Sequence, residues 1–387
     1  MANVIMQTSN LSTALRDIYS ALLRQAARQN LIMNQAIEIW DEPGTQHGEK
    51  VYRTIHKQHK GTPGELSETT DPDSTPMSAY NIDISVREHG DTIQLTEKLK
   101  RLTFQPIVGQ RVLDVGWGMG VTLDQLAFWA HMETSNIWYA NSKSARASLV
   151  AGDTIDSTTV RKMVRNMGRR NATPFGGAGG YWLAYISPDL HFDMTGDDDW
   201  LAPHNYQDTY ALYRNEIGMW FNARFVESTA CKLPNAGAKT VETTLSADVA
   251  KLATTFSCSA GSSFTAGDVV TIGYAGITDM DDENFDETTE EVEVGSVSSN
   301  TITLATGSHF QFPHSSGDAA VLGADIHPII MVGENAVARA QALAPELRVQ
   351  EPVDKLQRLN SVGWYGIFGY GISHAWNLEV VECCPSA

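Results

Sequence analysis

The sequence predicts an α+β protein in which helices and an extended two-stranded arm precede an inserted β-rich module. One apolar stripe follows residues 107–132 at helical spacing. Two segments of alternating apolar and polar residues, 51–60 and 80–87, flank a long linker. After Pro234 the chain changes to short runs of Thr, Ser, Val and Gly, so residues 236–325 are expected to form the insert.

The first predicted element is a helix over residues 11–39. Ser12 or Thr13 can cap its start. Its apolar positions recur at helical spacing, at Leu11, Leu15, Ile18, Leu22 and Ala26.

The arm is predicted from two strands, Val51–Lys60 and Tyr80–Arg87, in which apolar residues alternate with polar ones. The segment between them, residues 61–79, is too long for a compact hairpin turn. We therefore interpret it as an arm that lies on another surface. The basic residues at its start, His56, His59 and Lys60, match no catalytic spacing.

Residues 107–132 allow two interpretations, and the choice decides the function. The first is one long buried helix, with apolar residues at Val108, Val112, Val115, Met119, Leu123, Leu126 and Ala130. The second is a strand, a glycine loop and a helix, because Asp114, Gly116, Gly118 and Gly120 resemble the first motif of methyltransferases that bind S-adenosylmethionine.

The second interpretation lacks its next requirement. A nucleoside-binding unit needs an acid at the end of a second strand about 20 residues further on. The corresponding segment, Asn136–Asn141, is followed by Ser142 and Lys143. We favour the buried helix and keep a methyltransferase with the glycine motif 114–120 as the alternative.

Patterning predicts the remaining elements. They are a helix over Ser157–Ala172, strands over Tyr181–Ser187, Ala223–Ser228 and Ile326–Val332, helices over Asp208–Phe221 and Glu334–Leu343, and strand-like alternation over Trp364–Cys383.

The charge argues against a protein whose main task is to bind nucleic acid. The chain has 387 residues, with 28 Lys and Arg against 46 Asp and Glu, a formal net charge of −18. Phosphate binding depends on clustered basic side chains. Residues 236–387 carry −14 of this charge, which places most of it in and after the insert.

We expect no membrane association, because the chain has no apolar run of about 18 residues. The first residues lack a basic stretch followed by an apolar one, so we expect no signal peptide. The four cysteines show no metal-binding spacing. Synthesis in a reducing cytoplasm is the expectation.

Three charged segments are candidate ion sites. In 279–293, acids occupy four positions of a calcium-loop pattern, but Asn284 stands where Gly is needed, which favours a solvated loop. Residues 197–199 are three consecutive Asp, which could hold a metal but favour a polar turn. The segment 157–173 has five basic residues and no acid. It could touch phosphate, but we favour a polar helix face that meets acids on a neighbouring subunit.

Sequence motifs of zinc proteases, serine hydrolases and phosphate-binding loops are missing from the sequence. We therefore assign no catalytic, cofactor-binding or metal-binding residues and expect no cofactor. The chain is expected not to be an enzyme.

Read from end to end, the chain resembles the major capsid proteins of tailed phages, in the family typified by the capsid protein of coliphage N-four. The similar stretches in the body are Ile93–Phe104, Thr122–Asp124 with Asn136–Asn141, Gly179–Asp189, Asn215–Gly218 with Arg224–Glu227, Ser361–Trp364 and Tyr370–Ile372. Within the insert, Phe264–Ile272, Val297–Leu304 and His314–Val321 resemble a small β-barrel module common in phage structural proteins.

This resemblance implies the fold named after phage Hong Kong ninety-seven. The implied division is an N-terminal arm (1–48), an extended β-arm (49–105), a peripheral domain with a spine helix (106–175), a first axial part (176–235), the insertion (236–325) and a C-terminal axial and peripheral part (326–387). The family would place residues 116–120 inside the spine helix.

The resemblance also implies partners. Pentamers and hexamers of one chain would close into an icosahedral shell around double-stranded DNA, without sequence-specific binding. Because only about 48 residues precede the arm, we expect a separate scaffolding protein, besides a portal. A cement protein could bind the insert. Another virion or adhesin protein built on the β-module is the remaining alternative.

Overall fold

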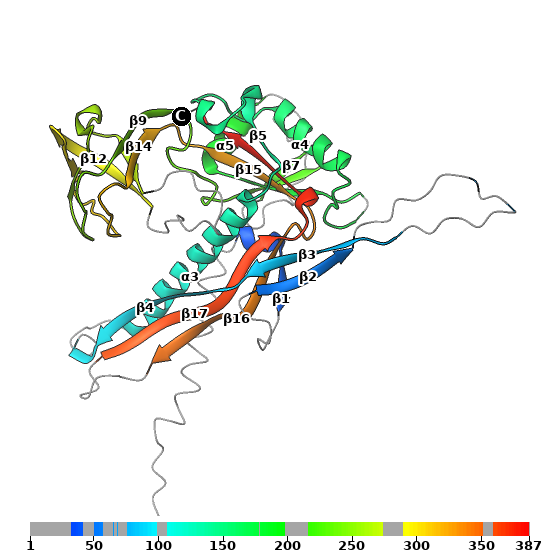
Figure 1. The fold of residues 1–387 in the computed structure, drawn as a ribbon, viewed down its shortest axis with the longest axis horizontal. Helices are drawn as coiled ribbons and strands as arrows, with labels where there is room; N and C mark the ends of the chain where they lie inside the picture. Colours follow the sequence, from blue (N-terminus) through cyan, green and yellow to red (C-terminus); the bar gives the residue numbers. More distant parts are fainter. Residues whose placement is uncertain are drawn as a thin grey trace, which may run out of the picture. The chain divides into compact units, whose positions relative to one another are not determined.

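The computed structural model describes residues 32–41, 50–56, 65, 68, 76–98, 107–177, 179–197, 216–273, 289–350 and 359–386 (Figure 1). The chain forms two compact units. The first comprises residues 1–30, 38–122 and 338–373, and the second 31–37, 123–337 and 374–387. Within the described part of the chain, no helix has both the length and the apolar character needed to span a membrane.

The first unit contains a sheet of long strands (Figure 1). Its order is β1 (Ile37–Asp41), β16 (Val337–Gln350), β17 (Leu359–Ile372) and β4 (Arg87–Thr96). Strands β17 and β4 pair antiparallel from Leu359 opposite Thr96 to Phe368 opposite Arg87. Gly369 of β17 has no room for a side chain, since a Cβ there would lie 1.9 Å from the carbonyl oxygen of Ser85.

The predicted arm is a separate two-stranded sheet in this unit. Strands β2 (Lys50–His56) and β3 (Ala79–Ser85) pair antiparallel, from Lys50 opposite Ser85 to His56 opposite Ala79. One end of the ribbon is held by a small apolar cluster, made of Trp40, Val51, Ile84, Ala338 and Ala340.

The second unit is built on a six-stranded mixed sheet. Its order is β5 (Ile137–Tyr139), β18 (Leu378–Cys383), β15 (His327–Val332), β6 (Trp182–Ile186), β8 (Ala223–Glu227) and β7 (Glu216–Trp220). Every residue of β15 and β18 is buried, so both faces of these strands are covered. The α-helices described in this unit, besides the end of α3, are α4 (Ser157–Arg169) and α5 (Pro188–Thr195).

The insert forms a second six-stranded sheet within the same unit. Its order is β10 (Thr255–Ser257), β13 (Thr301–Leu304), β12 (Glu290–Ser298), β11 (Val269–Ile272), β14 (Ala319–Gly323) and β9 (Lys239–Thr244), with every neighbouring pair antiparallel. Phe256 and Phe310 meet edge to face in its core, with ring centroids 5.8 Å apart. The β-rich composition was therefore a correct guide to secondary structure.

Residues 107–132 are one helix, α3 (Ile107–Met132), as the apolar stripe predicts. Short 3-10 helices complete the described elements: η1 (Met33–Ala36), η2 (Ala140–Ser142), η3 (Arg146–Ser148), η4 (Gly261–Ser263) and η5 (Ala375–Asn377).

The predicted helix over Glu334–Leu343 is wrong, because β16 occupies 337–350. Ala338 and Ala340 are completely buried while Arg339 between them is not, which is the alternation of a strand. Alanine has a high helix propensity, but pairing with β1 and β17 in the long sheet overrides it here.

The predicted helix over Asp208–Phe221 is also wrong where it can be compared. Residues 216–220 form β7, and 208–215 lie outside the described residues. Strand β7 turns into β8 through Phe221 and Asn222, which both have positive φ (47° and 69°). Two such residues form the tight turn that joins antiparallel strands.

The predicted N-terminal helix over 11–39 differs from the structure at its described end. Met33–Ala36 form a 3-10 helix and Ile37–Asp41 a strand, while residues 11–31 lie outside the described residues. Trp40 is buried, whereas its neighbours Ile39 and Asp41 are exposed. This alternation suits an edge strand beside β16.

Candidate assembly surfaces

One face of the arm is exposed for most of its length, whereas the other face is buried or partly buried except at Arg53. Tyr52 is 59% exposed, and polar pairs cross between the strands, with Lys50 Nζ 2.8 Å from Asp83 Oδ2 and Thr54 Oγ1 donating to Asn81 Oδ1 at 2.8 Å. Only one end of the ribbon reaches the apolar cluster. An isolated two-stranded ribbon is marginally stable in water, so this geometry suits an element that is ordered by a neighbouring surface.

The glycine motif lies in the middle of α3 and forms no ligand loop. Asp114 is exposed and pairs with Arg111 at 3.0 Å, one helical turn away. A Cβ at Gly118 would meet no atom within 4 Å, so this glycine is not needed for close packing. The strand and glycine loop that a methyltransferase requires are therefore missing at 111–120, and that interpretation is wrong.

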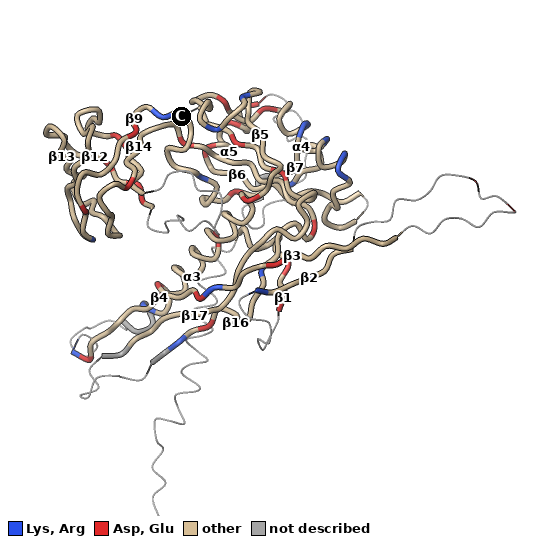
Figure 2. Tube along the Cα trace, viewed as in Figure 1, with Lys and Arg blue, Asp and Glu red and all other residues tan. Residues whose placement is uncertain are grey.

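Helix α4 carries the basic segment. Its start is capped by Asp156, whose Oδ1 accepts from the N–H of Thr159 at 2.7 Å. One face is buried through Val160, Met163 and Met167, whereas Arg165 and Arg169 project into solvent. Figure 2 shows this row of basic residues along α4. The predicted polar helix face is present, and its contact with a neighbouring subunit stays a prediction.

The inner basic residues of this region bind buried acids of β18. Arg170 pairs with Glu379, which also accepts from Trp138 Nε1 at 2.7 Å and from Asn166 Nδ2 at 2.8 Å. Burial raises the pKa of Glu379, although these hydrogen bonds and Arg170 act to lower it. Such pairs fix the position of the strand, because an unpaired buried carboxylate is costly.

Arg146 and Glu382 form the second pair on β18. Arg146 Nε lies 2.8 Å from Glu382 Oε2, and its Nη2 lies 2.5 Å from Oε1. Burial by itself lowers the pKa of Arg146, but the paired carboxylate raises it above its usual value. Sequence patterning missed both pairs. Both faces of β18 are buried, so its glutamates are buried too, although a polar residue in an alternating strand is normally expected on an exposed face.

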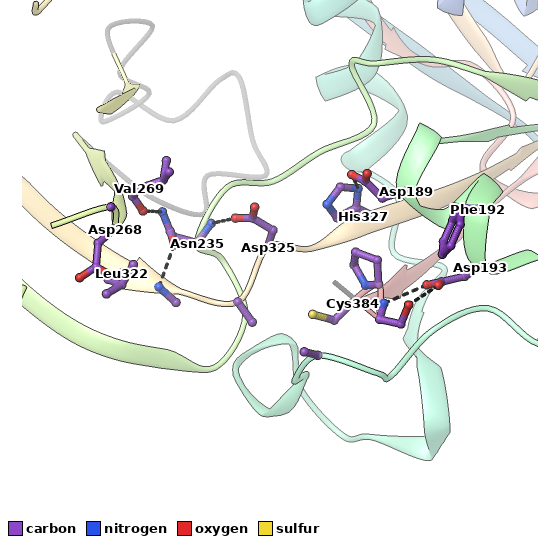
Figure 3. Close-up of a pocket in the computed structure, with 16 residues that line it drawn as sticks. Asp189, Phe192, Asp193, Asn235, Asp268, Val269, Leu322, Asp325, His327 and Cys384 are labelled. Carbon is purple, nitrogen blue, oxygen red and sulfur yellow. Dashed lines mark hydrogen bonds and ion pairs between the residues drawn. The ribbon is translucent and has the colours of Figure 1, made fainter. Parts of the chain in front are cut away.

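A pocket of about 590 Å³ lies where the insert joins the body of the second unit (Figure 3). The body contributes α5 and His327, and the insert contributes the start of β11 and the end of β14. Carboxylates line it, from Asp189, Asp193, Asp268 and Asp325, together with the apolar side chains of Phe192, Val269 and Leu322. The sequence analysis did not identify this pocket.

His327 is buried beside this pocket. Its Nδ1 lies 2.7 Å from Ser187 Oγ and 3.6 Å from Asp189 Oδ2. Burial lowers the pKa of His327, against the opposing effect of nearby carboxylates, so its neutral form is favoured at pH 7. A signal for α5 was visible in the sequence, since Ser187 caps the helix and Pro188 begins it.

The other candidate ion sites gain no support in the described part of the chain. Glu290 of the acidic run accepts from the N–H groups of Gln311 and Phe312 and contacts His314 Nε2 at 3.0 Å, so it anchors a loop. Asp197 accepts from the N–H of Ser157 at 3.2 Å. The remaining residues of both candidate sites, 279–288 and 198–199, lie outside the described residues, as do His59 and Lys60. Across the described ranges, no cluster of three or more possible metal ligands occurs.

Comparison with known proteins gives one consistent result. No protein-family model matches the chain, and neither does any curated protein sequence. Solved structures do match. The capsid of Ralstonia phage GP4 is 10% identical with a TM-score of 0.58, over 92% of this chain and 88% of that chain.

Two further matches agree with the first. The capsid of the cyanophage P-SCSP1u is 10% identical with a TM-score of 0.54, over 92% of this chain and 88% of that chain. The capsid asymmetric unit of cyanophage Pam1 is 13% identical with a TM-score of 0.52, over 92% and 90%. The chain therefore has the α+β fold of phage capsid proteins, and the predicted fold class is confirmed.

Proposed function

We propose that this chain is the major capsid protein of a tailed double-stranded DNA phage. The observation that carries the proposal is the shared fold, which extends over 92% of the chain in three phage capsid structures. A match over 92% of the chain extends into both compact units. The role is structural and non-enzymatic, in the virion, with synthesis and assembly in the cytoplasm of the bacterial host.

The principal partner is the chain itself. Pentamers and hexamers would use the arm as a contact element, because one of its faces is exposed on the isolated chain and the arm would gain order by lying on an adjacent subunit. Each contact can be weak, since every subunit makes many contacts at once. The division into arm, peripheral, axial and insertion parts given above belongs to this proposal.

The remaining partners follow from the same role. The net charge of −18 suits a shell that encloses DNA without binding it tightly. A scaffolding protein and a portal would act during assembly, and a cement protein could bind the insert, which carries much of the acidic charge.

The proposal is tested by expressing the chain alone and with a scaffolding protein, then imaging the product by negative-stain electron microscopy. Uniform icosahedral particles are the expected result. A compact monomer under both conditions contradicts the proposal. Deletion of residues 236–325 is the second experiment. A shell protein should retain some assembly without the insert, whereas an adhesin built on the β-module should lose its function completely.

A further inference from the structure

We propose that the pocket between the insert and the body receives arginine side chains from α4 of a second copy of this chain. The inference rests on the proposed function, because it names a contact between neighbouring subunits. The two surfaces belong to the second unit, and both are built from described residues.

The pocket is rich in hydrogen-bond acceptors and poor in cations. Four carboxylates line it. Among the described residues, Lys232 contacts one of them, with Nζ 3.1 Å from Asp325 Oδ2, and His327, whose neutral form is favoured, contacts another. Among the residues that the structure describes, Asp193 accepts hydrogen bonds from the hydroxyl of Thr154 and from Ser386. Negative charge therefore exceeds positive charge among the described residues around the pocket.

A buried imidazole adds an acceptor that lies inside the pocket. His327 is 2% exposed, and both of its contacts in the described chain are made by Nδ1. When Nδ1 carries the proton, it faces Ser187 Oγ and the Asp189 carboxylate, and Nε2 is then an acceptor. In Figure 3 the second ring nitrogen of His327 points away from Asp189 toward the pocket. Nε2 has no partner among the described residues, so it can accept from a donor that enters the pocket.

The rim adds apolar contact. Phe192 is 75% exposed and Val269 is 44% exposed, and both line the pocket. A guanidinium group combines many donors with a flat face that stacks on an aromatic ring and a stem that covers apolar surface. An arginine side chain therefore fits this set of groups better than a simple cation does.

The matching donors lie on α4. Arg165 and Arg169 are exposed, stand one helical turn apart, and contact no carboxylate within the described ranges. Like charges at this spacing destabilise a helix slightly, so an acidic partner would reduce the repulsion between the two arginines. Figure 2 shows the basic row of α4 well away from the C-terminal end of the chain, and residues 384–386 of that end line the pocket. One copy therefore cannot satisfy its own pocket, and the contact joins copies head to tail, which is the arrangement that generates a ring.

The test is a charge exchange within one chain. Arg165→Glu with Arg169→Glu reverses the donor side, and Asp189→Lys reverses the acceptor side at an exposed carboxylate in the first turn of α5. Asp189→Asn removes that charge without reversing it. Matched controls are Lys251→Glu and Glu293→Lys, which reverse exposed charges elsewhere on the insert.

Ring formation is measured by native mass spectrometry and sedimentation velocity at low and physiological salt, after circular dichroism shows that each variant is folded. Each one-sided reversal is expected to weaken association about tenfold, Asp189→Asn by less, and the controls by less than twofold. The chain that carries all three reversals should recover most of the association, because opposite charges meet again.

Three results overturn the inference. One is a combined variant that associates no better than the one-sided variants. The second is loss of association with Asp189→Lys but not with the α4 variant, which points to a basic partner other than this chain. The third is a wild-type chain that forms particles while the reversals change nothing, which contradicts this inference and leaves the proposed function intact. A wild-type chain that never forms rings or particles contradicts the proposed function.

Discussion

Removal of Arg146 should destabilise the second unit far more than removal of an exposed arginine. The Glu382 side chain is completely buried, and both of its oxygens are bound by Arg146, whose side chain is only 17% exposed. Arg146→Ala leaves that carboxylate in the sheet with no other hydrogen-bond partner within the described residues. Breaking a buried pair from one side costs about 3–5 kcal/mol.

A graded comparison makes the reasoning testable. Arg170→Ala should cost less, about 2 kcal/mol, because Glu379 keeps its hydrogen bonds from Trp138 and Asn166. Arg111→Ala removes an exposed pair with Asp114, so it should cost less than about 1 kcal/mol. Replacing both members, as in Arg146→Met with Glu382→Leu, should restore much of the loss, since no buried charge is then left unpaired.

The assay is urea denaturation of the unassembled protein, followed by tryptophan fluorescence and far-ultraviolet circular dichroism. The free energy of unfolding is compared among variants at pH 7. The expected order of destabilisation is Arg146→Ala, then Arg170→Ala, then Arg111→Ala. If Arg146→Ala costs no more than Arg111→Ala, the pair does not hold β18, and the reasoning from its burial is wrong.

Two further predictions concern α3. Gly118→Ala should raise the free energy of unfolding by about 1 kcal/mol, because the added Cβ meets no atom within 4 Å and alanine favours a helix; a lower thermal midpoint than wild type would contradict it. Burial raises the pKa of Asp124 to about 6 from 3.8, against hydrogen bonds from the N–H groups of Met33 and Ile32 and from Ser228. The folded state thus holds this proton more tightly than the unfolded state, and the Asp124 contribution to stability falls as pH rises from about 4 to about 6, by about 3 kcal/mol. Asp124→Asn should remove that dependence, and a stability difference between variant and wild type that stays constant between pH 4 and pH 7 would refute it.

Sequence patterning was most successful where one physical signal dominated. The apolar stripe of α3 consists of seven residues at helical spacing, and the tertiary structure keeps this segment as a helix. Strands β2 and β3 alternate clearly because the ribbon has two distinct faces. The segment 334–343 misled because alanine satisfies a helix locally, whereas β16 forms through partners that lie far away in the sequence.

The pocket could not be predicted from the sequence. Asp189 lies far in the sequence from Asp325 and His327, and the pocket also needs residues of the insert, so only the folded unit brings these groups together. Glu379 and Glu382 resemble ordinary polar strand positions until both faces of β18 are known to be covered. The fold class, in contrast, could be predicted, because the stretches that resemble phage capsid proteins are spread along the whole chain.

The strand order of the second unit also determines when that unit can fold during translation. Strand β6 ends at Ile186, but its neighbour β15 begins at His327, and β18 lies beyond that. Strand β8 follows β6 sooner, but the ribosome must release about 140 further residues before β6 finds its antiparallel partner β15, and such distant pairing is slow. The strands of the insert all lie within 239–323, so the insert can form first. The body sheet of a nascent chain is therefore incomplete until Cys383 has emerged from the ribosome. This order delays contacts between this unit and other subunits that are translated from the same messenger RNA.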